Sequence, residues 1–181
     1  MDDYSVGDVK AIGASGKVWM GFHAVDIADL LFGELEKADS SIQISTYSTG
    51  HGSDEMKNFF NILEKKLGDT NMQINMIVND DGKNNTVTPF ARKRIQELQY
   101  YKPEQFFPQF FKQTKINNLT KILHSKLIVI DGTTALIGSA NLSKGALESN
   151  YEIMLKVEGD VAVNLSQMLS KLSEEIEKGN A

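Results

Sequence analysis

The sequence predicts an α/β layer fold formed by a single domain that covers residues 1–181. Two observations lead to this prediction. Segments in which apolar and polar residues alternate, as in strands, are interspersed with segments whose apolar residues recur at helical spacing. The 181 residues are also enough for one sizeable core and too few for two comfortable domains, and no linker or repeat divides them.

In the first half of the chain we expect two helices and two strands. A helix is expected over Val25–Ala38, and Ser41–Thr46 alternates apolar and polar residues as a strand does. Ser53 is a suitable N-cap for a second helix that extends to Leu67. A second strand is expected over Met72–Val78, and the sequence NDDG that follows it is a turn signal.

In the second half of the chain we expect one helix, then a hairpin, and then a second helix. Thr88 and Pro89 suit the cap and the first position of a helix that runs to Tyr101. The dipeptide DG at 131–132 is a strong turn signal between the apolar runs KLIVI and TTALI. The last helix is expected over Asp160–Lys178, where apolar residues recur along one face.

Two segments are less regular. Lys17–His23 reads either as a strand or as a loop on the substrate side. Lys102–Lys121 carries four phenylalanines around Pro108, and aromatic residues at this density usually pack in a core or at a dimer contact. A groove wall or lid is the alternative for this aromatic cluster. We treat 82–121 as a variable segment, aromatic and basic in composition.

The charge of the chain is unevenly distributed. The net charge is −5 and the pI about 5.2, which argues against a surface coated in basic charge for nucleic acid. The segment Arg92–Lys126 nevertheless holds eight Lys and Arg residues against two Glu residues, and such a segment attracts phosphate-bearing ligands. Considered alone, a solvated helix face and loop is the simpler explanation. The absence of Cys excludes disulfides, thiolate nucleophiles and Cys-based zinc sites.

The sequence gives no sign of membrane insertion or secretion. No segment approaches the roughly 18 consecutive apolar residues of a membrane span. The stretch MDDYSVGDVK at the beginning is acidic and polar, whereas a secretory signal starts basic and continues apolar. We therefore expect a cytoplasmic protein without stable membrane association.

The stretch HSKLIVIDGTTALIGSANL combines two strand-like runs with polar residues at both ends. If the DG dipeptide forms a two-residue turn, Ile130 lies opposite Thr133 and His124 lies opposite Ser139. His124 and Lys126 differ by two positions and therefore share one face of their strand. The open end of the hairpin is expected to gather four polar side chains, those of His124, Lys126, Ser139 and Asn141.

These four side chains suit an anionic tetrahedral centre such as a phosphate. Lys126 supplies a point charge, and Ser139 and Asn141 supply neutral donors. The imidazole of His124 is able to act as a nucleophile or as an acid–base group near neutral pH. A metal fits poorly, because one His and one Lys without a convergent pair of carboxylates do not form a ligand set.

The spacing His-x-Lys-x4-Asp-x6-Gly-Ser-x-Asn resembles the HKD signature of the phospholipase D superfamily. The six matching residues are His124, Lys126, Asp131, Gly138, Ser139 and Asn141. The preceding strand–helix–strand order is also similar, and the resemblance extends from Val25 to the C-terminus, with 82–121 the least matched part. It implies a mixed β-sheet flanked by helices on both faces, in a single-motif, nuclease-like member of the superfamily.

The resemblance also implies how a phosphodiester would be cleaved. His124 attacks phosphorus and forms a phosphohistidine intermediate. Lys126 and Asn141, helped by Ser139, stabilise the charge that builds on the phosphate oxygens. No metal and no cofactor are implied, because the protein itself supplies the charge.

Three further residues receive roles from the resemblance. Superfamily members carry a Glu about one strand after the motif that hydrogen-bonds the catalytic imidazole. Glu152 fits this position, and Glu148 is the competing choice. Asp131 and Gly138 are implied to have structural roles within the motif.

This mechanism needs two imidazoles, and the chain carries one motif. His23 and His51 are the other histidines, and neither has a Lys two residues later, so we interpret both as surface or packing residues. A symmetric homodimer that brings the two copies of His124 together over one phosphorus supplies the missing half. We therefore expect a homodimer.

Single-motif members of this size resemble bacterial nucleases and restriction-type endonucleases. We therefore expect a metal-independent phosphodiesterase that hydrolyses nucleic acid, with DNA as the first choice and, by analogy, a helicase or other ATPase as a partner. One alternative is a phospholipid phosphodiesterase whose apolar rim is the aromatic cluster. Another is an inactive, dimeric nucleic-acid-binding module. The sequence leaves open the choice among DNA, RNA and lipid, the strand preference and the product ends.

Overall fold

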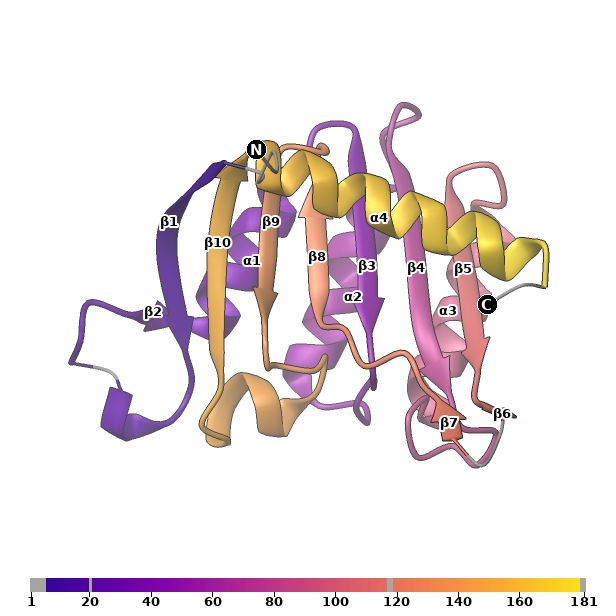
Figure 1. Cartoon of the computed structure of the whole chain (residues 1–181), viewed down its shortest axis with the longest axis horizontal. Coiled ribbons are helices and arrows are strands. Elements are labelled where there is room, and N and C mark those ends of the chain that lie inside the picture. Colours follow the sequence, from indigo (N-terminus) through magenta and orange to yellow (C-terminus); the bar gives the residue numbers. More distant parts are fainter. Residues whose placement is uncertain (1–5, 20, 117–118, 180–181) are drawn as a thin grey trace.

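The computed structural model describes residues 6–19, 21–116 and 119–179, and these form an α/β sandwich around one large sheet. The eight strands of this sheet lie in the order β2-β1-β10-β9-β8-β3-β4-β5. Helices α1, α2 and α3 cover one face, and α4 crosses the other face (Figure 1). The fold class predicted from the sequence is thereby confirmed.

The elements have the following bounds. The strands of the sheet are β1 (Gly7–Ala14), β2 (Val25–Asp26), β3 (Ser41–Thr46), β4 (Gln73–Asp80), β5 (Phe106–Lys112), β8 (Leu127–Ile130), β9 (Thr134–Gly138) and β10 (Ile153–Gly159). The helices are α1 (Ile27–Lys37), α2 (Asp54–Lys66), α3 (Pro89–Tyr101) and α4 (Asp160–Glu177). The shorter elements are a 3₁₀ turn η1 (Lys17–Trp19), a π-helical turn η2 (Gly145–Ser149) and the two strands β6 (Thr114–Ile116) and β7 (Leu119–Lys121).

The strand directions bring several chain ends to one edge of the sheet. Strands β3, β4 and β5 are parallel, and β8 is antiparallel to β3. Strand β9 is antiparallel to both β8 and β10. The ends of β3, β4, β5 and β9 therefore meet the beginnings of β8 and β10 at the same edge, which is the lower edge in Figure 1. We call this the catalytic edge, because the residues expected from the sequence to be catalytic lie there.

The sheet is buried on both faces in its centre. Ile128 and Ile130 pack with α1 and α2 in the larger core, whereas Leu127 and Val129 pack with α4 in the smaller one. Because successive side chains of a strand point to opposite faces, only a strand covered on both sides buries all four residues. This explains why LIVI at 127–130 is a continuous apolar run.

Most of the expected helix boundaries agree with the structure. Ser53 caps α2 by accepting a hydrogen bond from the Met56 N–H, and Thr88 caps α3 with Pro89 at its first position. Helix α1 begins two residues later than expected, because the side chain of Asp26 accepts hydrogen bonds from its first turn. The sequence NDDG was expected to be a turn, but its first two residues continue β4 against β5.

The turn between β8 and β9 has three residues, whereas the sequence predicted two. Ile130 pairs with Thr134, so the pairing that placed Thr133 opposite Ile130 and Ser139 opposite His124 does not occur. Asp131 and Gly132 have positive φ angles of 51° and 67°, as the DG signal predicts. The turn nevertheless takes a third residue, because Asp131 is held against the beginning of β3 by hydrogen bonds in both directions.

The two irregular segments have defined structures. Lys17–His23 contains the 3₁₀ turn η1 and bends rather than a strand, with residue 20 outside the described residues. The aromatic cluster lies in β5, the edge strand next to β4. Phe106 and Phe111 are buried, in agreement with packing as the main role, and Phe107 is 40% exposed. Pro108 is tolerated in β5 because an edge strand leaves one side of its backbone unpaired.

No helix among the described residues is long and apolar enough to cross a membrane.

Candidate active site

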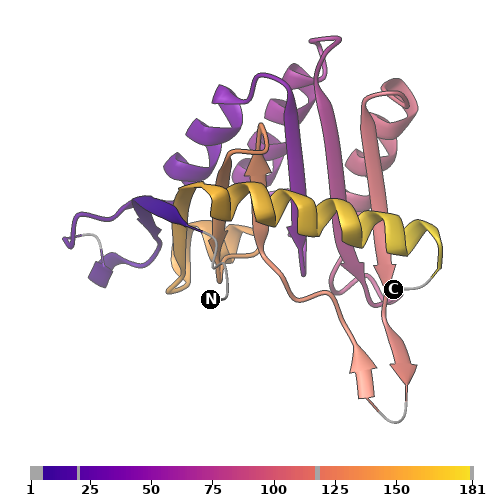
Figure 2. The same ribbon diagram turned by 45° about the horizontal axis from the view of Figure 1, so that its top comes forward.

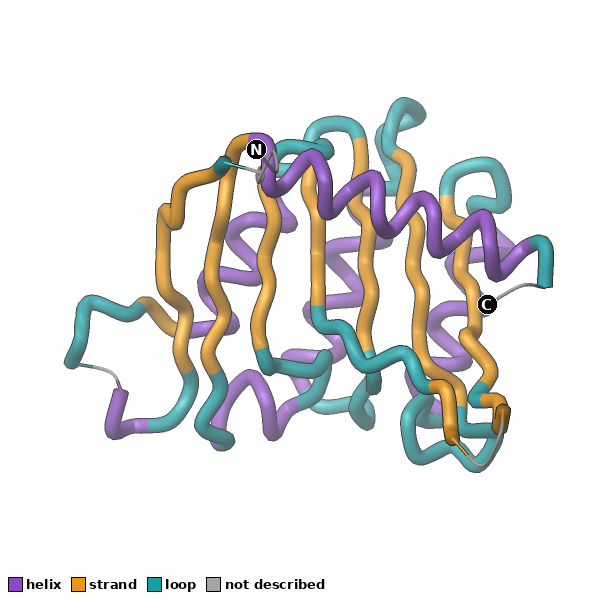
Figure 3. The backbone as a smooth tube through the Cα atoms, in the orientation of Figure 1, coloured by secondary structure: helices purple, strands orange, loops and turns teal. Residues whose placement is uncertain are grey.

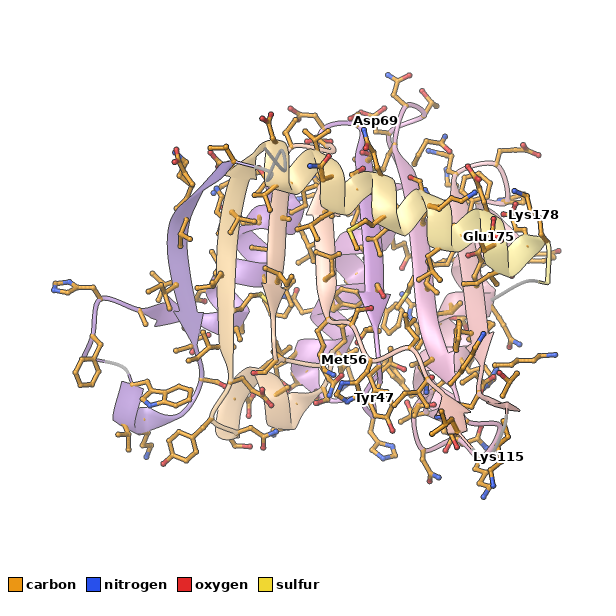
Figure 4. The ribbon with its side chains drawn as sticks, viewed as in Figure 1. Tyr47, Met56, Asp69, Lys115, Glu175 and Lys178 are labelled. Carbon is orange, nitrogen blue, oxygen red and sulfur yellow. The ribbon has the colours of Figure 1, made fainter. Side chains whose placement is uncertain are left out.

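The predicted catalytic residues lie at the catalytic edge, on loops and strand ends that converge there. Figure 3 shows the loop that leads from β7 into β8, which crosses the α4 face of the sheet and carries His124 and Lys126. The loop that follows β3 lies beside it, because β3 and β8 are neighbours with Ser45 opposite Leu127. Tyr47, on that second loop, is labelled at the lower edge in Figure 4.

Hydrogen bonds on both sides of His124 fix the direction of its side chain. The backbone N–H of Leu123 donates to the buried Oδ1 of Asn79 at 3.0 Å, and the Leu123 side chain packs against Ile77. On the other side, the hydroxyl of Ser125 hydrogen-bonds that of the buried Ser45. Since neighbouring side chains in extended backbone alternate, anchoring residues 123 and 125 to the protein leaves His124 exposed to solvent.

Lys126 lies directly against the imidazole. Its Nζ is 3.2 Å from Nδ1 and 3.3 Å from Nε2 of His124, and it donates to the His124 carbonyl oxygen at 2.9 Å. Burial lowers the pKa of the Lys126 ammonium, and the negative charge of Glu152 opposes part of that shift. The imidazole and the ammonium therefore form one compact pair at the surface.

Tyr47 is a site residue that the sequence analysis missed. Its ring centroid lies 4.8 Å from that of His124 with the planes inclined by 55°, and the Nζ of Lys126 is 5.3 Å from the Tyr47 centroid. This contact restricts the orientation of the imidazole, and the cation–π contact does the same for the ammonium. The only signal in the sequence is that Tyr47 directly follows a strand, and nothing there shows that this strand pairs with β8.

The second half of the motif lies next to the pair formed by His124 and Lys126. Gly138 donates its N–H to the Lys126 carbonyl, and a Cβ at Gly138 would lie 2.1 Å from the Ile153 carbonyl oxygen. Only glycine therefore allows β9 and β10 to approach this closely. Asn141 lines a small hollow together with Lys126, and its buried Oδ1 has no hydrogen-bond partner within the described residues.

Glu152 joins the site through Ser139. The Ser139 hydroxyl donates to the Glu152 carboxylate, which also accepts a hydrogen bond from the Asn150 side chain at 3.3 Å. Among the described residues, the carboxylate of Glu152 is bonded to Ser139 and Asn150 and the imidazole of His124 to Lys126, so the predicted hydrogen bond between Glu152 and His124 is not formed within one chain. The competing residue, Glu148, lies in η2 and pairs with Lys144 at 3.6 Å.

Asp131 lies at the opposite end of β8 from His124. Its carboxylate accepts hydrogen bonds from the backbone N–H groups of Asp39, Ser40 and Ser41, at 2.7 to 3.2 Å. Burial acts to raise the pKa of Asp131, but these donors outweigh it and lower the pKa below its usual value. Asp131 thus fastens the β8–β9 turn to the chain that leads into β3.

The two other histidines are exposed and are not joined to the site by hydrogen bonds or ring contacts among the described residues. His23 has a positive φ of 57° in the loop after η1. His51 lies in the loop between β3 and α2. The described parts of the chain also contain no group of three or more His, Cys, Asp or Glu side chains placed to hold a metal ion.

A mixed sheet with the HKD residues at one edge defines the phospholipase D-like class of α/β domains. The family described as "Cardiolipin synthase, PLD-like domain" matches residues 31–178, and the chain therefore belongs to this family of PLD-like domains. The resemblance drawn from the motif is confirmed. A search of curated proteins found no match.

Several solved structures share the fold. NucT from Helicobacter pylori superposes with a TM-score of 0.69 at 22% identity, over 94% of this chain and 97% of that chain. Nuc from Salmonella typhimurium, a phospholipase D family member, gives 0.61 at 18% identity over 92% and 93%. Phosphatidylserine synthase from Haemophilus influenzae gives 0.63 at 15% identity over 97% of this chain and 40% of that chain. At these identities the likeness establishes the fold alone.

Proposed function

We propose that this protein is a metal-independent phosphodiesterase that hydrolyses nucleic acid, with DNA as the first choice, through a phosphohistidine intermediate in a homodimeric site. One observation carries the proposal: an exposed imidazole lies against a partly buried ammonium, and Asn141 lines the same small hollow as that lysine. A phosphodiester needs a nucleophile and fixed positive charge at the same place, and this arrangement offers both.

The proposed reaction proceeds in two steps. A ring nitrogen of neutral His124 attacks phosphorus, and the bond from phosphorus to the leaving oxygen breaks while that oxygen takes a proton from a second imidazole. The second imidazole then removes a proton from water, which attacks the phosphohistidine and releases His124. Lys126 and Asn141 stabilise the negative oxygens in both transition states.

The second imidazole is supplied by another copy of the chain. Neither His23 nor His51 contacts His124 among the described residues, and the exposed position of His124 leaves its outer side open to a partner. A two-fold axis beside His124 would place two imidazoles and two ammonium groups around one phosphate. Glu152 is proposed to hydrogen-bond the catalytic imidazole. It would do so either by contacting His124 of the partner subunit or by releasing Ser139 and binding His124 of its own chain.

Nucleic acid is the favoured substrate because of the charge near the site. No Asp or Glu occurs between Glu104 and Asp131, a stretch that contains four Lys residues and His124. This local charge contrasts with the net charge of −5 and provides phosphate contacts along a polymer. The low overall charge also agrees with delivery of the substrate by a partner such as a helicase or other ATPase.

A phospholipid phosphodiesterase is the second candidate. The aromatic cluster, which this alternative would use as its apolar rim, offers little surface for that role, because Phe106 and Phe111 are buried and Phe107 is 40% exposed. A different apolar surface favours this candidate: a hollow of about 210 Å³ is lined by Ile12, Trp19, Phe22 and their neighbours, and Ile153, next to Glu152, forms part of its wall. A lipid chain would find apolar contact there.

The test is an incubation of the purified protein with plasmid DNA, single-stranded DNA, RNA and phosphatidylcholine vesicles, each in the presence of EDTA. We expect cleavage of nucleic acid to persist in EDTA and to fall by about a thousandfold or more in His124→Ala. His51→Ala, which removes another exposed histidine near the same edge, is the matched control and should retain activity.

Three outcomes would contradict the proposal. Activity that EDTA abolishes would require a metal. Release of a lipid headgroup without nucleic-acid cleavage would support the second candidate. Binding of DNA without cleavage, unchanged in His124→Ala, would support the third candidate, an inactive nucleic-acid-binding module.

A further inference from the structure

Strands β6 and β7 form a hairpin that projects beyond the sheet at the catalytic edge. The two strands pair antiparallel, with Thr114 opposite Lys121 and Lys115 opposite Thr120. They form a separate two-stranded sheet, and Figure 2 shows it extending past the end of β5. A hairpin with so few pairs buries little apolar surface of its own, so packing in the core does not explain its presence.

The hairpin is basic and its charges are not neutralised. Lys115 and Lys121 lie within it and Lys112 lies at its base, and all three side chains are exposed. None of the three forms an ion pair with a residue that the structure describes. Elsewhere many lysines are paired, as Lys171 is with Glu174 and Glu175. Unpaired cations gathered on a projecting element are suited to a polyanion.

The chain connects the hairpin directly to the catalytic residue. Lys121 precedes His124 by three residues, and three residues of extended backbone span at most about 10 Å. Leu123, between them, is buried and its N–H is bonded to Asn79, so the base of the hairpin has a fixed position relative to the imidazole. Lys115 and Tyr47 are both labelled at the lower edge in Figure 4, which places the outer part of the hairpin and the site on the same side of the molecule.

We propose that the β6–β7 hairpin is a substrate-binding arm, in which Lys115 and Lys121 bind the phosphates of a nucleic-acid strand next to the phosphate under attack. This inference rests on the proposed function and adds the element that recognises a polymeric substrate. The register puts the two lysines on opposite faces of the hairpin. Their flexible four-carbon stems let both ammonium groups reach a strand that lies along its outer edge.

The test compares Lys115→Ala/Lys121→Ala with the control Lys57→Ala/Lys65→Ala, which removes two exposed lysines from α2. Both double variants are made in a His124→Ala background, so that the oligonucleotide is bound but not cleaved. The binding constant K for a single-stranded oligonucleotide is then measured at several salt concentrations. Each phosphate contact contributes about 0.7 to the slope of log K against log salt for a single strand. We expect the hairpin variant to reduce that slope by about 1.4 and the control variant to leave it unchanged.

Activity separates this inference from the proposed function. With His124 intact, the hairpin variant should raise KM for oligonucleotide cleavage at least about tenfold and leave kcat/KM unchanged for bis(p-nitrophenyl) phosphate, which has no neighbouring phosphates. An unchanged salt slope and KM in a variant that cleaves DNA would overturn the arm and leave the nuclease standing. A variant that lost binding to anionic vesicles instead of DNA would also overturn it. If the unmodified protein cleaves no nucleic acid, the proposed function itself fails.

Discussion

The side chains of His124 and Lys126 are held in place by neighbouring residues to which the proposed reaction assigns no chemical role. Ser125 and Leu123 are turned inward and bonded to Ser45 and Asn79, and this leaves His124 facing outward. Tyr47 restricts both the imidazole and the ammonium from the side. These contacts reduce the number of orientations available to the His124 and Lys126 side chains before a substrate binds, and in the proposed reaction this would lower the entropy lost on reaching the transition state.

At this scale, the charge of Glu152 should support the charge of Lys126. Burial lowers the pKa of Lys126 and Glu152 raises it, so Glu152→Gln should lower the pKa of Lys126 further. Glutamine has nearly the same shape and still accepts a hydrogen bond from Ser139. The measurement is an NMR titration of the Lys126 side chain in the two proteins.

Glu148→Gln is the control, because Glu148 pairs with Lys144 and is not among the groups that shift the pKa of Lys126. It should leave the Lys126 titration unchanged. A pKa of Lys126 that stayed constant or rose in Glu152→Gln would show that the two groups are not coupled.

Among the elements, the β8–β9 hairpin carries both halves of the motif and is fixed to the sheet at its turn. The Asp131 carboxylate accepts backbone N–H groups from the segment that enters β3. At the other end of the hairpin, Gly138 permits close contact with β10. Because the hairpin is held at its turn and at Gly138, we expect changes at the turn to alter the position of Lys126 relative to Asn141.

Replacement of Asp131 should destabilise the protein in a pH-dependent way. Because hydrogen bonds from the backbone lower the pKa of Asp131 in the folded protein below its usual value, ionised Asp131 contributes stability that is present above the unfolded pKa and is lost as the pH falls through the folded pKa. Asp131→Asn keeps a residue that tolerates positive φ but removes the charge. We expect a loss of about 1 kcal/mol at pH 7, since the site is partly open to water.

Thermal unfolding of the two proteins between pH 3 and pH 7 measures this effect. The difference in Tm between Asp131→Asn and the unmodified protein should shrink as the pH falls below about 4. Asp39→Asn removes a neighbouring exposed carboxylate and should have little effect at any pH. An Asp131→Asn difference that is independent of pH would show that the charge is not what stabilises the turn.

The whole molecule presents its site at an open edge rather than inside an enclosed pocket. His124 is exposed, and the hollow that Lys126 and Asn141 line is small. A water-excluding site therefore requires a second surface, which in our proposal is another copy of the chain. The consequence is that activity should depend on both copies of His124.

Mixed dimers distinguish a shared site from two independent ones. If unmodified protein and His124→Ala are unfolded together in equal amounts and refolded, random pairing makes about one quarter of the dimers fully intact. The reference is the activity of unmodified protein at the same total chain concentration. If the site is shared and needs both imidazoles, we expect about one quarter of that activity to remain. About one half remaining would mean that each chain acts alone, and it would overturn the homodimeric mechanism.

The sequence alone determined the features that depend on local spacing. The two-residue spacing placed His124 and Lys126 side by side, although both lie in the loop before β8 rather than in a strand. Side-chain caps marked the beginnings of α2 and α3, and the motif identified the superfamily. These predictions succeeded because each depends on residues only a few positions apart.

The tertiary structure decided whatever depends on contacts between distant segments. The hydrogen bond between the Ser45 and Ser125 hydroxyls, which orients the segment around His124, joins residues 80 positions apart. Tyr47 reaches His124 only because β3 pairs with β8. The turn gained its third residue through Asp131 bonds to a segment about 90 positions earlier. Which strands become neighbours depends on burial over the entire sheet. The spacing of residues within one segment therefore does not predict the order of the strands.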